Sequence, residues 1–108
     1  MMQDYISNSK TTIHPNSYQL HTPASPHWAA ELDGVVIGLD QIIEPKTKNH
    51  LVIEGAGGVL VPLNSTDCVI DIIQSDYKVI VVSRHYLGSI NHTLLTIEAL
   101  QNRNIKIA

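Results

Sequence analysis

Two apolar runs constrain the fold of this 108-residue chain more than any other feature. The first, "HLVIEG" at 50–55, is too short for a helix and is bounded by asparagine and glycine, and the second is "KVIVVSR" at 78–84. Continuous apolar runs of this kind are typical of strands buried on both faces. A helical pattern follows each run, and a third run begins at Ile105. This order predicts an α/β fold, with a parallel sheet and flanking helices.

Start and stop signals place a short helix ahead of the first run. Ser25 offers a hydroxyl at the N-cap and Pro26 suits the first helical position, so "HWAAEL" is expected to be helical up to Gly34. Residues 39–45 are expected to form another turn or two, ended by proline.

Two further helices are expected after the first and second apolar runs. Residues 65–77 carry apolar side chains on one side, with Ser65 or Thr66 as the expected cap. Residues 87–104 repeat apolar residues at helical spacing, with Ser89 positioned to cap.

Composition excludes several classes of function. The formal net charge is −3 and the seven basic residues are scattered singly, so no nucleic-acid partner is expected. The longest apolar run is about half of a bilayer span and contains Glu54, so no membrane segment is expected. The six histidines lack metal-ligand spacing. The lone Cys68 and the polar first ten residues favour a reducing, cytoplasmic setting.

The first candidate site is the exit from the first apolar run. Glu54 ends the run, and three glycines follow within four positions at Gly55, Gly57 and Gly58. Backbone N–H groups without Cβ atoms can converge on an anion, and a carboxylate can hold Mg²⁺ directly or through water. The pattern suits a metal-bound nucleotide phosphate. Alternatively, the glycines only make a tight turn and Glu54 caps a helix or pairs with a lysine.

The second candidate site is the turn after the second run. Gly88 permits a sharp exit, and the next residues present free N–H groups at a helix N-terminus, which suits carboxylate or phosphate. The side-chain amide of Asn91 adds a donor. An ordinary capped helix is the alternative. In parallel sheets both turns fall on the rim where ligands bind.

Three stretches together resemble a known family. "SPHWAAEL", "VIEGAGGVLVPLN" and "VIVVSRHYLGSINHTLLTIEAL", in that order and spacing, are similar to dethiobiotin synthetase, from about Pro15 to Ala108. The resemblance implies a P-loop NTPase-like α/β homodimer that binds Mg²⁺-ATP and 7,8-diaminononanoate. Such an enzyme carboxylates an amine with CO₂, activates the carbamate by phosphoryl transfer from ATP, and closes the ureido ring of dethiobiotin.

The resemblance also implies roles for residues of both candidate sites. Glu54 matches the family's Mg²⁺-binding carboxylate. The phosphate-side loop corresponds to Glu54, Gly55, Ala56 and Gly57. The helix start that receives the substrate's tail carboxylate from across the dimer corresponds to Gly88, Ser89 and Asn91. A stretch with a positioning role corresponds to Ser25, Pro26 and His27.

The sequence departs from the family pattern at both ends. It has neither the phosphate loop GTxxxxGKT nor the KPxxxG stretch with its catalytic lysine, and nothing follows the run at Ile105 to recognise adenine. We therefore expect 1–108 to be a single incomplete domain, truncated at both ends, with no catalytic residue retained. Weak ATP binding, undetectable turnover and self-association through an unpaired apolar edge are expected.

Two alternatives remain open from the sequence. One is a fragment of a cobyrinate-type amidoligase, which shares the carboxylate and glycines at the strand exit, although the "LGSINH" turn argues against it. The other is a non-catalytic binding or dimerisation module. Tight diaminononanoate binding without ATP hydrolysis would favour that module.

Overall fold

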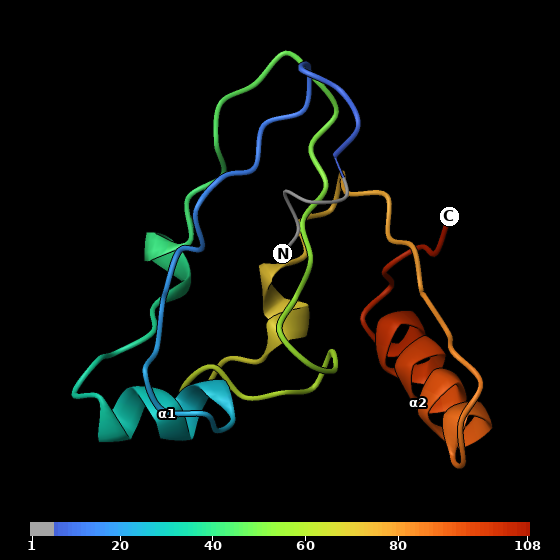
Figure 1. Ribbon diagram of the computed structural model, residues 1–108. Coiled ribbons are helices and arrows are strands. Elements are labelled where there is room, and N and C mark those ends of the chain that lie inside the picture. Colours follow the sequence, from blue (N-terminus) through green and yellow to red (C-terminus); the bar gives the residue numbers. More distant parts are fainter. Residues whose placement is uncertain (1–5) are drawn as a thin grey trace.

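The computed structural model describes residues 6–108, which form two α-helices and two 3-10 turns (Figure 1). In chain order these are α1 Pro26–Leu32, η2 Leu39–Gln41, η3 Val69–Ile72 and α2 Ser89–Asn102. Extended or irregular chain connects them. Within residues 6–108, no helix is both long enough and apolar enough to cross a membrane.

Helix α1 confirms the predicted helix and the place of Pro26, but the Ser25 side chain at the N-cap makes no capping hydrogen bond. Proline occupies the first turn, Ala29 and Ala30 are buried, and the chain leaves the helix through Asp33. The Asp33 carboxylate accepts a hydrogen bond of 2.7 Å from the Thr22 hydroxyl, which ties the incoming chain to the helix end. That bond, together with one from the backbone N–H of His21, lowers the pKa of Asp33.

The helix predicted over 65–77 is wrong in extent and in its cap, because only the single turn η3 forms. Asn64 is the reason: its side-chain oxygen accepts the N–H groups of Thr66 and Asp67, each at 2.8 Å. Those bonds fold the segment into a turn before a helix can start. The N-cap is instead Cys68, whose N–H donates to the carboxylate of Asp71 at 2.8 Å.

Helix α2 confirms the prediction for 87–104, but Ser89 is not its cap. Gly88 takes that place in a left-handed conformation with φ of +93°, and Ser89 is the first helical residue. The Ser89 N–H donates to the Tyr86 carbonyl at 3.0 Å. At the far end the chain turns through Asn104, with φ of +57°.

The parallel sheet remains a prediction, because residues 6–108 contain isolated bridges and no strand. Val79 and Ile107 form a parallel bridge, and the N–H of Ala108 donates to the Val79 carbonyl at 2.8 Å. This contact joins the second and third apolar runs in the predicted direction. The first run, at 50–55, is extended and unpaired within the described residues.

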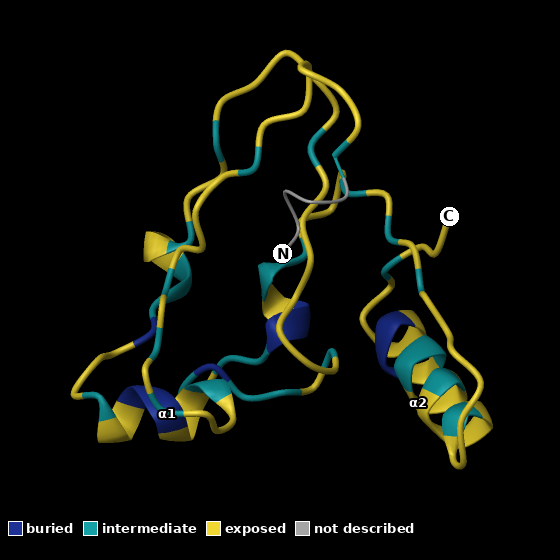
Figure 2. Cartoon of the chain, viewed as in Figure 1, coloured by how far each residue is buried: buried dark blue, intermediate teal, exposed yellow. Residues whose placement is uncertain are grey.

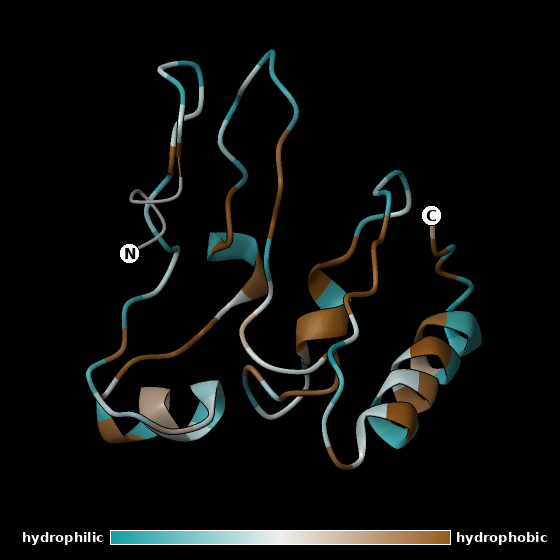
Figure 3. Cartoon of the chain, turned by 45° about the vertical axis from the view of Figure 1, so that its right-hand side comes forward, coloured by the Kyte–Doolittle hydropathy of each residue, from teal (hydrophilic) through white to brown (hydrophobic). Residues whose placement is uncertain are grey.

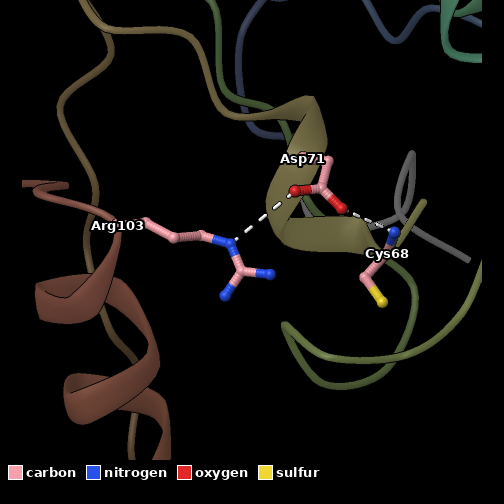
Figure 4. Close-up of polar contacts among 3 residues, drawn as sticks. All are labelled: Cys68, Asp71 and Arg103. Carbon is pink, nitrogen blue, oxygen red and sulfur yellow. Dashed lines mark hydrogen bonds and ion pairs between the residues drawn. The ribbon is translucent and has the colours of Figure 1, made fainter. Parts of the chain in front are cut away.

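Two small apolar clusters form the core (Figure 2). The buried members of the first are Ala30, Ile37, Leu63 and Val69. The buried members of the second are Ile70, Ala99 and Leu100. The turn η3 joins them, since adjacent residues of this turn enter different clusters. An ion pair links the same turn to the end of α2, with 3.7 Å between Arg103 Nε and Asp71 Oδ1 (Figure 4). Both partners are partly exposed, so solvent weakens the pair.

Candidate functional site

The segment 54–57 forms an exposed loop, and the Gly55 backbone lies close to Val69 of η3. Gly57 has φ of +79°, a conformation that favours glycine. A Cβ atom on Gly55 would lie 2.7 Å from Cγ1 of the buried Val69. The two glycines therefore have separate local functions. Gly57 permits the turn, and Gly55 permits the backbone to approach the core.

The chain after the loop is anchored to η3 by backbone hydrogen bonds. The Val61 N–H donates to the Gly58 carbonyl at 3.0 Å and closes a turn. From η3, the N–H of Val69 donates to the Val61 carbonyl at 3.0 Å, and that of Ile70 to the Val59 carbonyl at 2.8 Å. The loop is therefore held firmly at its C-terminal end, next to the core.

The Glu54 side chain is exposed beside a cavity of about 1570 Å³. Glu54 and residues 55–57 all line this cavity, and so do Val79 and Ile80 of the second apolar run. No ion pair or side-chain hydrogen bond joins Glu54 to another residue within 6–108. In the described part of the chain, the alternative roles of helix cap and lysine partner find no support.

The turn before α2 presents backbone donors to solvent. The N–H of His92 makes the first helical bond, to the Gly88 carbonyl at 3.0 Å. The N–H groups of Ile90 and Asn91 precede that bond and have no backbone acceptor within residues 6–108. The Asn91 side chain is also exposed. These free donors are those of any helix start, and the anion site stays a prediction.

Side chains that the sequence analysis missed hold this turn in place. The Tyr86 hydroxyl lies 2.8 Å from Nδ1 of His92, which closes a bridge across the glycine turn. The Arg84 guanidinium lies 6.0 Å from the centre of the Tyr86 ring. Hydroxyls of Ser83 and Thr93 are 2.8 Å apart. The sequence signal for this bridge is a tyrosine and a histidine six positions apart, on either side of a glycine.

The described chain does not bring the two candidate sites into one pocket. Residues 54–57 line the large cavity, whereas Gly88, Ser89 and Asn91 do not. In Figure 1 the turn before α2 lies at the lower right, away from the chain that leads into the 54–57 loop. Of the stretch Ser25–His27, proline lines the cavity and the other two residues are exposed.

Comparison with known proteins identifies the family. Residues 1–108 match the family described as AAA domain. The chain belongs to the AAA domain family. This membership confirms a P-loop NTPase-like fold class, while the predicted parallel sheet is not confirmed by the isolated bridges. No solved structure matches the chain.

Three curated relatives of this AAA domain share the name ATP-dependent dethiobiotin synthetase BioD. The protein of Christiangramia forsetii is 53% identical over 100 residues, covering 93% of this chain and 48% of the relative. That of Cytophaga hutchinsonii is 55% identical over 104 residues, covering 94% and 50%. One from Rhodopseudomonas palustris is 50% identical over 96 residues, covering 88% and 46%. The chain spans about half the length of these relatives, and the resemblance to dethiobiotin synthetases is confirmed.

Proposed function

We propose that this chain is the part of an ATP-dependent dethiobiotin synthetase that carries one phosphate loop and one substrate-carboxylate site. The whole enzyme would use Mg²⁺-ATP and CO₂ to carboxylate 7,8-diaminononanoate and close the ring of dethiobiotin. Identity of 53% to a relative of that name, over 93% of this chain, carries the proposal. On this proposal, 1–108 is a single, incomplete domain, and the completed fold has a parallel sheet with flanking helices.

The 54–57 loop is the proposed phosphate site. Its exposed backbone can bring the N–H groups of Gly55, Ala56 and Gly57 close to phosphate oxygens. Glu54 is the proposed Mg²⁺ ligand. A single exposed carboxylate fits Mg²⁺, which keeps several waters and is held by one or two carboxylates together with substrate phosphates. Among residues 6–108, no cluster of three acidic, histidine or cysteine ligands provides a closed metal site.

Bound Mg²⁺ would neutralise phosphate charge during phosphoryl transfer. The chain's own residues bind and orient: Glu54 sets the position of the cation, and the glycine backbone fixes the phosphate group. A side chain at position 57 would displace this backbone, because the φ of +79° at Gly57 is unfavourable for residues other than glycine.

The start of α2 is the proposed site for the substrate's tail carboxylate. Gly88, Ser89 and Asn91 shape it, with the unpaired helix-start N–H groups as donors. The bridge between Tyr86 and His92 keeps the turn in one conformation. Since the described chain separates this turn from the phosphate loop, a homodimer in which each site serves the partner's substrate is part of the proposal. The proposed compartment is the cytoplasm, in keeping with the free thiol of Cys68.

A chimeric enzyme tests this function. The matching half of the Christiangramia forsetii relative is replaced by this chain, and dethiobiotin formation from diaminononanoate, CO₂ and Mg²⁺-ATP is measured. We expect product at a rate within about tenfold of the relative, because about half of the aligned residues are identical. A chimera that folds and binds ATP but forms no dethiobiotin would reject the function.

A further inference from the structure

The turn before α2 carries basic side chains without a nearby acid in the sequence. No acidic residue lies between Asp76 and Glu98, whereas that stretch contains Arg84, His85 and His92. None of these three basic side chains forms an ion pair within residues 6–108. An anion at this turn would therefore meet positive charge and no competing carboxylate from the described chain.

The imidazole of His92 lies beside the start of α2. Side chains in helices point back toward the N-terminus, and this ring lies over Gly88. A Cβ atom on Gly88 would lie 3.5 Å from Cε1 and 4.0 Å from Nε2 of His92, both ordinary contact distances. The Tyr86 hydroxyl lies 2.8 Å from Nδ1, and the two ring centres are 5.7 Å apart. Tyr86 thus occupies one ring nitrogen, while Nε2 has no hydrogen-bond partner in the described chain.

The contact with Tyr86 allows Nε2 to carry a proton in two ways. In the first, the Tyr86 hydroxyl donates to Nδ1 of a neutral ring, so the ring hydrogen is on Nε2. In the second, the ring is an imidazolium, Nδ1–H donates to the Tyr86 oxygen, and Nε2 also carries hydrogen. Only a neutral ring with its hydrogen on Nδ1 leaves Nε2 bare. An anion beside Nε2 favours the two arrangements that offer it an N–H donor.

The tip of the same turn is apolar. Leu87 is fully exposed and Ile90 is 76% exposed. Figure 3 shows a hydrophobic segment at this tip, directly before α2. An anionic group at the end of an alkyl chain suits such a surface better than a free inorganic anion does, because the chain can cover the exposed apolar side chains.

We propose that His92 is a further binding residue for the substrate's tail carboxylate, and that Tyr86 is its positioning residue. Nε2–H of His92 donates to one carboxylate oxygen, while Tyr86 holds the imidazole through Nδ1. The existence of a carboxylate site rests on the proposed function. The assignment of the two ring nitrogens rests on the contacts of His92 with Tyr86 and Gly88.

Two substitutions in the chimeric synthetase separate binding by His92 from support of the turn. His92→Asn keeps a polar group near the position of Nδ1, within reach of Tyr86, but has none at the position of Nε2. His92→Gln can place its amide near Nε2 and gives up the contact with Tyr86. The KM is measured for diaminononanoate and for its primary amide, which keeps the alkyl chain and lacks the negative charge.

We expect His92→Asn to raise the KM for the acid about tenfold and that for the amide less than about twofold, because a charge-assisted hydrogen bond is lost. The kcat for both substrates should stay unchanged. His92→Gln should raise the KM for the acid less than His92→Asn does. If His92 only supports the turn, the order of the two variants is reversed and both substrates are affected alike, which would overturn the proposal.

A positioning variant and a matched control complete the test. Tyr86→Phe should raise the KM for the acid about threefold, because the imidazole loses its orientation but keeps its donor. His85→Asn should change neither KM, since His85 is exposed and makes no side-chain hydrogen bond within residues 6–108.

The parent chimera distinguishes failure of this inference from failure of the proposed function. Equal KM values of the parent for acid and amide would reject the carboxylate site itself, and the role of His92 with it. A parent that prefers the acid, together with a His92→Asn variant that keeps the same preference, would overturn the role of His92 alone.

Discussion

Substitution of Gly55 by alanine tests the packing of the phosphate loop. The added Cβ atom would lie 2.7 Å from Cγ1 of Val69, a side chain only 8% exposed in the first core cluster. Valine is stiff about χ1, so the contact is relieved only by moving the loop or the core. Overpacking of this kind costs about 1–3 kcal/mol, and the stiffer unfolded chain offsets about 0.4–1 kcal/mol. The net expectation is a loss of about 1–2 kcal/mol.

Urea unfolding of the 108-residue chain measures this loss as a lower midpoint. With a slope of about 1 kcal/mol per molar, the midpoint should fall by about 1–2 M. Gly58→Ala is the matched control, because its Cβ would lie 4.0 Å from Val61, an ordinary contact. In the double variant Gly55→Ala with Val69→Ala, the loss of stability should be about 1 kcal/mol smaller than the sum of the two single losses, because the smaller side chain at position 69 removes the close contact. If Gly55→Ala is as harmless as the control, close packing is not the reason for this glycine.

Two further predictions concern the helix ends. Gly88→Ala should destabilise α2 by about 1–2 kcal/mol, because a φ of +93° is unfavourable for residues other than glycine. Circular dichroism during thermal unfolding measures this loss. An unchanged melting curve would show that alanine is not strained at this position. The folded-state pKa of Asp33 lies below its ordinary value of 3.8, so its contribution to stability is present above that value and is lost as pH falls through the lower folded pKa. Asp33→Asn should remove this part of the acid dependence, seen in unfolding midpoints between pH 2 and 5, and a variant with the same profile as the parent would count against the bond from Thr22.

Local signals in the sequence predicted both α-helices. Pro26 at the start of α1 and Gly88 before α2 act within one turn of chain, so neither needs a distant partner. The caps were harder to predict. Ser65 and Thr66 have side chains that can cap a helix, but the side-chain oxygen of Asn64 already accepts the neighbouring N–H groups.

The sheet depends on segments that are distant in sequence. The run at 50–55 has strand composition, yet its pairing requires a neighbour that the described chain does not supply. The parallel contact of Val79 with Ile107 formed because both partners are present. At the candidate sites, the sequence correctly marked turns with glycine, but the bridge from Tyr86 to His92 depends on three-dimensional proximity. The roles of the site residues stay predictions.

The role of Glu54 in the chimeric synthetase tests the central claim most directly. The rate of dethiobiotin formation is measured against Mg²⁺ concentration for Glu54→Gln and for Glu98→Gln, which changes an exposed carboxylate on α2. We predict that Glu54→Gln lowers the rate at least about tenfold and shifts the Mg²⁺ requirement upward, because the cation loses its protein ligand. Glu98→Gln should leave both unchanged. Equal rates and equal Mg²⁺ dependence for the two variants would contradict a phosphate and magnesium site at this loop.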